Sequence, residues 1–253
     1  MNHAPRTVLI TGATGDFGRA FTARFAALGS RIIVHGRDAS KVKAVIDGLS
    51  VPAYGMVCDV RDTVGMDAAV AAIPSDFADI DLLVNNAGGA LGLEKLQSAD
   101  MADLDNMIDM NVRALVHMTR LILPRMIANK RGHIINIGSV AGNWPYPGGH
   151  VYCASKAFVR QFSLALRSDL QGTQVRVTNV EPGMVETQFS LARFKGDAAR
   201  ADAVYANTTP LQADDIAETV VWCATLPPHV NINSVEIMPT TQSFGPLVVE
   251  RFA

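Results

Sequence analysis

The chain has 253 residues, of which 49% are hydrophobic and 18% are charged, and its formal net charge is -2. This balance is typical of a globular protein with a sizeable core, and it argues against a disordered, fibrous or nucleic-acid-binding chain. The three cysteines, Cys58, Cys153 and Cys223, are widely spaced and odd in number, which fits neither a disulfide framework nor a zinc site. The sequence has no signal-peptide pattern and no apolar run of ~18 residues. We therefore expect a cytoplasmic protein that does not enter a membrane.

The predicted elements alternate between strands and helices along the whole chain. Short apolar runs rich in β-branched residues predict seven strands, at 7–11, 31–36, 53–60, 81–89, 133–139, 175–180 and 234–238. Apolar residues at helical spacing predict helices between them, including a long one that Pro124 kinks or ends and one that runs to about Gln171. This alternation predicts a doubly wound α/β fold of the Rossmann type, with a seven-stranded parallel sheet and helices on both faces.

No linker, repeat or change of composition divides the chain, so we predict a single domain over residues 1–253. The polar segment 188–211 breaks the regular alternation. A long insertion of this kind in a compact domain is often a lid or a binding loop. A solvated helical excursion is the alternative interpretation.

A glycine-rich turn, TGATGDFG, joins the first predicted strand to the first predicted helix. Gly12, Gly15 and Gly18 allow close backbone approach to a phosphate, and the helix N-terminus presents free amides to it. At the end of the second strand, Gly36 and Arg37 leave room for a 2′-phosphate and offer it a cation, so we predict NADP rather than NAD. Asp38 beside them either repels that phosphate or caps the next helix.

Tyr152 and Lys156 lie four residues apart in a predicted helix, and residues at this spacing share a face. An ammonium group beside a phenol favours the phenolate, so the pair is a candidate proton-transfer device. Ser139, at the end of the fifth predicted strand, precedes Tyr152 by 13 positions.

Together these motifs resemble the short-chain dehydrogenase/reductase family in residue type and order. The resemblance covers nearly the whole chain and includes TGATGDFG, Asp59 and Val60, the NNAG of 85–88, Asn111, Ser139, Tyr152, Lys156, and the PG of 182–183. It implies an NADP-dependent dehydrogenase or reductase that acts on a CH–OH group.

The resemblance implies four catalytic residues. Tyr152 would exchange a proton with the substrate oxygen while a hydride moves to or from the nicotinamide. Lys156 would lower the pKa of the phenol and bind the nicotinamide ribose. Ser139 would position the reacting oxygen, and Asn111 would hold a water that links Lys156 to solvent.

The resemblance also implies a cofactor-binding set drawn from the glycine turn and from the ends of the later strands. Asp59 would accept a hydrogen bond from the adenine amino group. The full set is Gly12, Thr14, Gly15, Asp16, Phe17, Gly18, Arg37, Asp59, Val60, Asn86, Ala87, Gly88, Tyr152, Lys156, Pro182, Gly183, Val185 and Thr187.

Asp16 is the one departure, because the family's turn usually has glycine at this position. A carboxylate at a helix start is favourable, but it lies near an anionic pyrophosphate. We expect either that its side chain turns away from the phosphates or that cofactor affinity is reduced.

Within the family, GNWPYPGGHVYCASKAFVRQFS, RFKGD and HVNINSVEIMPTTQS are similar to the NADP-dependent 3-hydroxy acid dehydrogenase branch. Members of that branch act on serine, allo-threonine or 3-hydroxypropionate-type acids, or on the matching semialdehydes. A carboxylate substrate needs a cation, and Arg193 is the first candidate, ahead of Lys195. Trp144, Tyr146 and Met184 are candidates for the apolar wall, and Glu181 is a weaker candidate for binding a substrate amine.

Two further functions fit the same sequence. A related reductase of 3-oxoacyl thioesters or other carbonyl compounds would have a pocket of different charge. A non-catalytic NADP-binding sensor or scaffold would need no such catalytic set. The six histidines show no metal-ligand spacing, so we assign no metal. The resemblance further implies a homotetramer.

Overall fold

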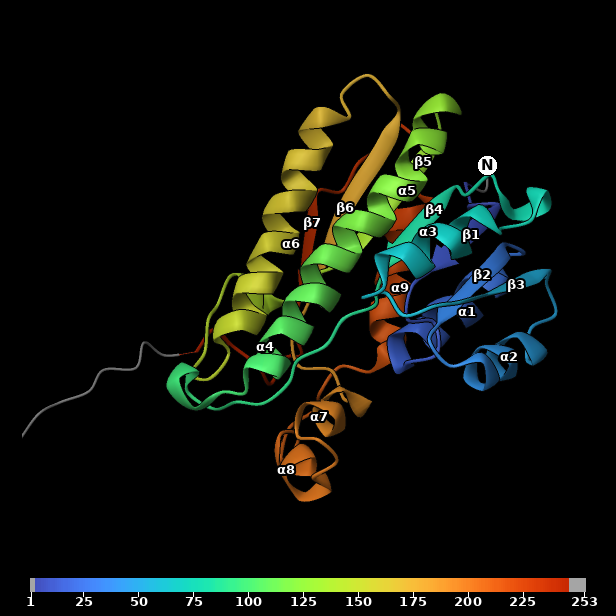
Figure 1. Cartoon of the computed structure of the whole chain (residues 1–253). Coiled ribbons are helices and arrows are strands. Elements are labelled where there is room, and N and C mark those ends of the chain that lie inside the picture. Colours follow the sequence, from blue (N-terminus) through green and yellow to red (C-terminus); the bar gives the residue numbers. More distant parts are fainter. Residues whose placement is uncertain (1–2, 246–253) are drawn as a thin grey trace, which may run out of the picture.

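The structure is a computed structural model, and it describes residues 3–245. All seven of its strands are parallel and belong to one sheet, in the order β3-β2-β1-β4-β5-β6-β7, which confirms the predicted doubly wound fold (Figure 1). The strands are β1 (Thr7–Ile10), β2 (Arg31–Gly36), β3 (Ala53–Val57), β4 (Leu82–Asn85), β5 (Gly132–Ile137), β6 (Val175–Pro182) and β7 (Ser234–Ile237).

Helices cover both faces of the sheet and bury two separate cores. The longer helices are α1 (Asp16–Ala27), α2 (Ala39–Asp47), α3 (Thr63–Ala71), α4 (Met101–Ile108), α5 (Ala114–Ala128), α6 (His150–Asp169) and α9 (Ala213–Thr225). On one face, Phe21 and Phe25 of α1 and Val220 of α9 pack against the strand side chains that point to that face. On the other face, Met118 of α5 and Leu166 of α6 pack against the alternate side chains. Strands covered on both sides must be apolar throughout, which explains the continuous β-branched runs.

The strand order reverses between β1 and β4, and this reversal fixes where a ligand can bind. Ile10 of β1 pairs with Val34 of β2 on one side and with Val84 of β4 on the other. The connections from β1 and β4 therefore leave the sheet in opposite directions and leave a crevice at the carboxyl edge between them. Ligands of open α/β sheets bind at such a switch point.

Several predicted boundaries were wrong. Strand β3 ends at Val57 rather than at 60, and β4 ends at Asn85 rather than at 89, because turns and side-chain hydrogen bonds replace the ladder beyond those residues. Pro124 does not end its helix, since α5 continues to Ala128. The long helix is interrupted instead at a π-helical turn, Asp109–Arg113, which separates α4 from α5.

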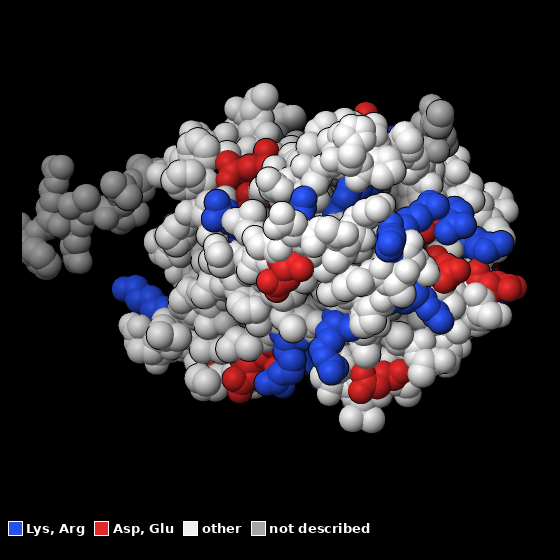
Figure 2. Space-filling view, turned by 90° about the horizontal axis from the view of Figure 1, so that it is seen from above, with Lys and Arg blue, Asp and Glu red and all other residues white. Residues whose placement is uncertain are grey.

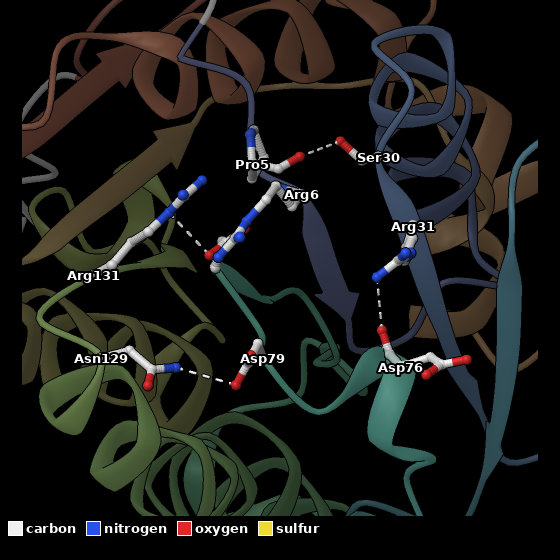
Figure 3. Close-up of polar contacts among 9 residues, drawn as sticks. Pro5, Arg6, Ser30, Arg31, Asp76, Asp79, Asn129 and Arg131 are labelled. Carbon is white, nitrogen blue, oxygen red and sulfur yellow. Dashed lines mark hydrogen bonds and ion pairs between the residues drawn. The ribbon is translucent and has the colours of Figure 1, made fainter.

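The amino edge of the sheet is held by polar contacts and lies opposite the crevice. The buried carboxylate of Asp81 pairs with Arg6 at 3.3 Å and with Arg131 at 3.0 Å. Figure 3 shows three further contacts at this edge, Ser30 to Pro5, Arg31 to Asp76 and Asn129 to Asp79. Seen from above, the molecule presents acidic and basic side chains side by side (Figure 2).

Two short helices, α7 (Gln188–Arg193) and α8 (Ala198–Ala203), form half of the 188–211 segment. They lie together at the lower end of the molecule in Figure 1, beyond the carboxyl ends of the strands. The segment is thus partly helical, and it contributes Phe189 and Arg193 to contacts with Tyr152. In residues 3–245 no helix is both long enough and apolar enough to cross a bilayer.

Candidate active site

The glycine turn after β1 is shaped by contacts that exclude side chains. Gly12 has φ +64, a conformation that other residues rarely adopt. A Cβ on Gly18 would lie 2.3 Å from the Gly12 carbonyl oxygen, so α1 packs directly on the turn. Gly15 is the N-cap of α1, and no side chain caps that end. The first amides of α1 therefore face the crevice as an anion-binding cradle, which fits the pyrophosphate of a dinucleotide.

Neighbouring strands fasten this turn, through residues that sequence reasoning did not select. The amide of Gly12 donates to Nδ1 of His35 at 3.1 Å, and His35 Nε2 lies 3.2 Å from the Cys58 carbonyl. Burial lowers the pKa of His35 to about 4, so its ring stays neutral with Nδ1 as an acceptor. The hydroxyl of Thr11 accepts from the amides of Asn86 and Ala87, at 2.9 Å each.

The predicted cofactor residue Asn86 also has a structural role. Its side-chain amide donates to the carbonyls of Thr11 at 2.8 Å and Gly12 at 3.1 Å. Asn86 thus ties the carboxyl end of β4 to the glycine turn. Ala87 follows on the same wall, with its Cα 3.1 Å from the position of a Cβ on Gly12.

At the end of β2, Gly36 fits the turn closely and Asp38 faces away from it. A Cβ on Gly36 would lie 2.9 Å from a methyl carbon of Thr14, so glycine is required for packing there. Asp38 is the N-cap of α2 and accepts from the amides of Ser40 and Lys41. The capping interpretation of Asp38 therefore holds. Arg37 is exposed beside them and is near enough to Asp59 to lower the pKa of that carboxyl slightly.

Asp59, predicted to contact adenine, is held by a residue that the sequence reasoning missed. Arg61 binds its carboxylate with two nitrogens, at 3.0 Å and 2.6 Å, and these hydrogen bonds lower the pKa of Asp59 to about 2. Arg61 also donates to Asn106 of α4 at 2.5 Å. The acid–base spacing of Asp59 and Arg61 was a signal that could have identified the pair. Val60 lies between them and is half-buried.

Tyr152, Lys156 and Ser139 meet at the carboxyl edge of β5. Lys156 Nζ donates to the carbonyl of Ile137, the last residue of β5, at 2.8 Å, and lies 5.8 Å from the centre of the Tyr152 ring. A hydrogen bond joins Tyr152 to Ser139. The Ser139 hydroxyl also accepts from the amide of Ala141 at 3.1 Å. The structure therefore brings the three predicted catalytic side chains together.

Burial is the largest influence on the pKa values of Tyr152 and Lys156. Burial raises the pKa of the Tyr152 phenol, and the hydrogen bond to Ser139 and the charge of Arg193 oppose that rise. Burial also lowers the pKa of the Lys156 ammonium to about 8. The low-dielectric surroundings dominate both groups.

Asn111 lies in the π-helical turn, 2% exposed, and three hydrogen bonds orient its side chain. It accepts from the Gly89 amide at 2.9 Å and donates to the Gly89 carbonyl at 2.9 Å and to Ser155 at 3.0 Å. A Cβ on Gly88 would lie 2.7 Å from Asn111 Oδ1 and 3.8 Å from Lys156 Nζ. Gly88 thus keeps open the gap between Asn111 and Lys156, where the predicted bridging water would lie.

Arg193, the last residue of α7, enters the same site from the 188–211 segment. Its guanidinium carbon lies 5.3 Å from the centre of the Tyr152 ring and 5.4 Å from the Tyr146 ring, and it donates to the Tyr146 hydroxyl. Phe189, which the sequence reasoning missed, packs on Tyr152 with centroids 5.8 Å apart. The buried Nε of Arg193 has no partner among the described residues. Arg193 therefore retains hydrogen-bonding capacity for an anionic ligand.

Three other substrate candidates have partners within the chain. Lys195 pairs with Asp103 at 2.7 Å. Glu181 is buried and is held by Asn179 and Asn143, so the structure gives it a structural role rather than contact with a substrate amine. Trp144 packs on Phe244 with tilted rings and centroids 4.4 Å apart, and its indole nitrogen donates to Glu236 at 3.2 Å.

The remaining predicted residues lie between β6 and α7. Pro182 ends β6, and a Cβ on Gly183 would lie 2.3 Å from the Gln242 side chain. The Met184 amide donates to Gln242 at 2.7 Å, Val185 forms a bridge with Leu211, and Thr187 caps α7. Thr14 and Phe17 flank the start of α1 and are half-buried. In residues 3–245 no group of three or more His, Cys, Asp or Glu side chains is placed to hold a metal.

Comparison with known proteins agrees with this geometry. Residues 6–197 match the family model described as short chain dehydrogenase. The chain is 53% identical over 245 residues to the NADP-dependent 3-hydroxy acid dehydrogenase YdfG of Salmonella typhi, covering 96% of this chain and 99% of the relative. It is 50% identical over 247 residues to sulfoacetaldehyde reductase 2 of Chromohalobacter salexigens, covering 96% and 98%.

Among solved structures, the fold is similar to the closed form of a serine dehydrogenase complexed with NADP+. The TM-score is 0.95 at 50% identity, over 97% of this chain and 100% of that one. A serine dehydrogenase from Escherichia coli gives a TM-score of 0.83 at 46% identity, over 94% and 100%. The chain therefore belongs to the short-chain dehydrogenase family.

Proposed function

We propose that this protein is an NADP-dependent dehydrogenase of small 3-hydroxy acids. Its substrates are of the serine, allo-threonine, 3-hydroxypropionate or 3-hydroxyisobutyrate type, or the matching semialdehydes in the reverse direction. The observation that carries this proposal is Arg193, whose guanidinium lies over the Tyr152 ring with a buried, unpartnered Nε among the described residues. A planar guanidinium at that place can bind a carboxylate by two nitrogens. The names of the relatives support the same substrate class.

Each residue of the site has a distinct task in this reaction. NADP, when bound, supplies the acceptor for the hydride that leaves the carbon bearing the hydroxyl. Tyr152 accepts the proton of that hydroxyl, Ser139 holds the reacting oxygen, and Arg193 holds the carboxylate. The hydrogen bond from Ser139 and the charge of Arg193 both favour the phenolate form of Tyr152. Substrate binding and proton removal therefore depend on one cluster of side chains.

The cofactor preference rests on the end of β2. Asp38 is engaged as the N-cap of α2, and Arg37 is the exposed cation next to it. A 2′-phosphate at this position would meet Arg37 without facing a free carboxylate. The glycine turn and the uncapped start of α1 support the pyrophosphate.

A second candidate substrate is a sulfonate. A sulfonate is also an anion with oxygens that a guanidinium can bind, and a relative at 50% identity is named sulfoacetaldehyde reductase 2. Isethionate and sulfoacetaldehyde therefore belong in any substrate screen. A reductase of 3-oxoacyl thioesters or a non-catalytic NADP-binding protein would, by contrast, give little turnover of small acids.

The testing experiment is a steady-state panel in both directions with NADP and NAD. It compares serine, 3-hydroxyisobutyrate, isethionate and an acetoacetyl thioester by kcat/KM. We expect the hydroxy acids with NADP to give the highest values. Failure of both hydroxy acids would refute the substrate class, and higher values for isethionate would favour the sulfonate. Equal kcat/KM with NAD and NADP would refute the role of Arg37.

The predicted assembly is a homotetramer in which the helices bearing Asn111 and Tyr152 pack between subunits. Ile108 beside the π-helical turn is 42% exposed, and Phe158 on α6 is 39% exposed and stacks on Phe162. These apolar side chains support burial of both helices against another copy. Light scattering on the purified protein tests this, and a monomer would contradict it. The cytoplasmic location and the single domain over 1–253 stay predictions.

A further inference from the structure

Asp16 has a partner far away in the sequence. One carboxylate oxygen of this residue, the first of α1, accepts a hydrogen bond from the backbone amide of Gln188 at 2.7 Å. Gln188 is the first residue of α7, and Thr187 before it is the N-cap. The carboxylate that departs from the family's glycine pattern is thus directed toward the 188–211 segment.

A single short helix, α7, connects the Asp16–Gln188 hydrogen bond to the substrate side of the site. Helix α7 has only six residues, and it carries Phe189 near its start and Arg193 at its end. Both contact the Tyr152 ring, at 5.8 Å and 5.3 Å between centres. Gln188 and Arg193 are the two ends of this helix, so a contact that holds Gln188 constrains the position of Arg193.

Two contacts hold the opposite end of α7. The amide of Gly92 donates to the Arg193 carbonyl at 3.0 Å, and Lys195 pairs with Asp103 at 2.7 Å. Asp16, in contrast, joins the start of α7 to the glycine turn. It is therefore placed where the cofactor-binding and substrate-binding parts of the molecule meet.

We propose that Asp16 and the Gln188 amide form a latch that joins the glycine turn to α7. The latch positions Arg193 and Phe189 against Tyr152, and it keeps the carboxylate directed away from the anionic part of the cofactor. Asp16 is a positioning residue in this scheme, because it acts on the substrate through α7. The proposal rests on the function proposed above for Arg193 and assigns a role to the one residue of the turn that departs from the family.

The test removes each side of the bond separately. Asp16→Ala removes the acceptor. Gln188→Pro removes the donating N–H together with the exposed side chain, for which Gln188→Ala is the control. Proline suits the first position of a helix that follows an extended residue such as Thr187, at φ -156 and ψ 172. We expect either change to raise KM for the hydroxy acid roughly 3- to 10-fold, the effect of losing one hydrogen bond to a charged group in partial contact with solvent. The double variant should be no worse than either single one.

The Kd for NADP is a second measurement. A merely structural role of Asp16 would not produce the pattern of Kd changes described next. Gln188→Pro leaves the carboxylate without its partner, so the NADP Kd should rise about 3-fold or more through charge repulsion. Adding Asp16→Ala should reverse that rise, since the charge is then gone. Asp16→Asn keeps an oxygen acceptor and should restore KM relative to Asp16→Ala.

The outcomes separate this proposal from the proposed function. If the wild-type protein oxidises none of the hydroxy acids, the proposed function is wrong. NADP titration and limited proteolysis of 188–211 still test the latch in that case. If the acids are oxidised but the effects of Asp16→Ala and Gln188→Pro on KM add in full in the double variant, the latch proposal is wrong. It is also wrong if Gln188→Pro leaves NADP affinity unchanged. Thermal unfolding of each variant identifies a general loss of folding.

Discussion

Replacing Arg193 by methionine should convert the protein from an acid-selective enzyme to one that no longer distinguishes an acid from its ester. Methionine keeps much of the apolar stem against Phe189 and Tyr146 and removes the guanidinium that lies 5.3 Å from the Tyr152 ring centre. Two hydrogen bonds between a guanidinium and a carboxylate contribute about 3 to 4 kcal/mol, given roughly 1.5 to 3 kcal/mol for each bond to a charged group and incomplete additivity. That range corresponds to a loss of ~10²- to 10³-fold in kcat/KM.

The assay compares 3-hydroxyisobutyrate with its methyl ester, as initial rates of NADPH formation. The ester has the same reacting hydroxyl but no charge, so it corrects for any displacement of Tyr152 caused by the substitution. We expect kcat/KM for the acid to fall by the factor above and that for the ester to change by less than about 5-fold. Arg200→Met is the matched control, because Arg200 lies on Phe194 in the same segment, 4.4 Å from its ring centre. An equal loss for acid and ester would refute the role of Arg193.

Three further predictions concern the cofactor site and Lys156. Gly18→Ala would place a Cβ 2.3 Å from a backbone oxygen, whereas a Cβ on Gly15 would lie 3.7 Å from one. Gly18→Ala should therefore lower Tm by roughly 4 to 10 °C, and Gly15→Ala should lower it by much less. Arg37→Ala should lower kcat/KM with NADP ~10-fold or more and leave that with NAD nearly unchanged. The pKa of Lys156 is about 8 in the folded chain against an ordinary 10.5, so the unfolded chain binds more protons between these pH values. Relative to Lys156→Met, the wild-type protein should therefore gain up to roughly 3 kcal/mol of unfolding free energy between pH 8 and 10.5.

Each of these has a clear contrary result. Equal Tm losses for the two glycine variants would mean that the turn can adjust around a Cβ. Equal losses with both cofactors would mean that Arg37 does not contact the 2′-phosphate. For Lys156, urea titrations at several pH values give the difference in unfolding free energy, and a difference that does not change with pH would show that burial does not perturb the ammonium group.

The fold was predictable because its signals are local. The β-branched runs of buried parallel strands and the glycine turn after the first strand can be read within short windows of sequence. The strand boundaries moved by a few residues, as at β3, where a turn that begins at Asp59 replaces the ladder. Side chains that fasten the turn, such as His35, were missed because an imidazole acting as an acceptor for Gly12 leaves no pattern in the sequence.

The catalytic side chains were predictable as a set, but their surroundings were not. Nothing in the sequence around Asn111 indicates a π-helical turn, because such a turn depends on packing against Gly89 and Ser155. The contact between Asp16 and Gln188 joins positions 172 residues apart, so one sequence cannot reveal it. The same holds for the burial that raises the pKa of Tyr152, since burial is a property of the whole assembled site.

The most direct test of the central claim is the Tyr152→Phe variant, measured for hydroxy acid oxidation with NADP and, separately, for NADP binding. If Tyr152 accepts the substrate proton, the variant should lose at least ~10²-fold in kcat, while its NADP Kd stays within a few-fold of the wild-type value. The wild-type rate of oxidation should also increase with pH and then level off, as expected when the phenolate is the active form. A Phe variant with near-normal kcat would contradict the assignment of Tyr152 and with it the proposed mechanism.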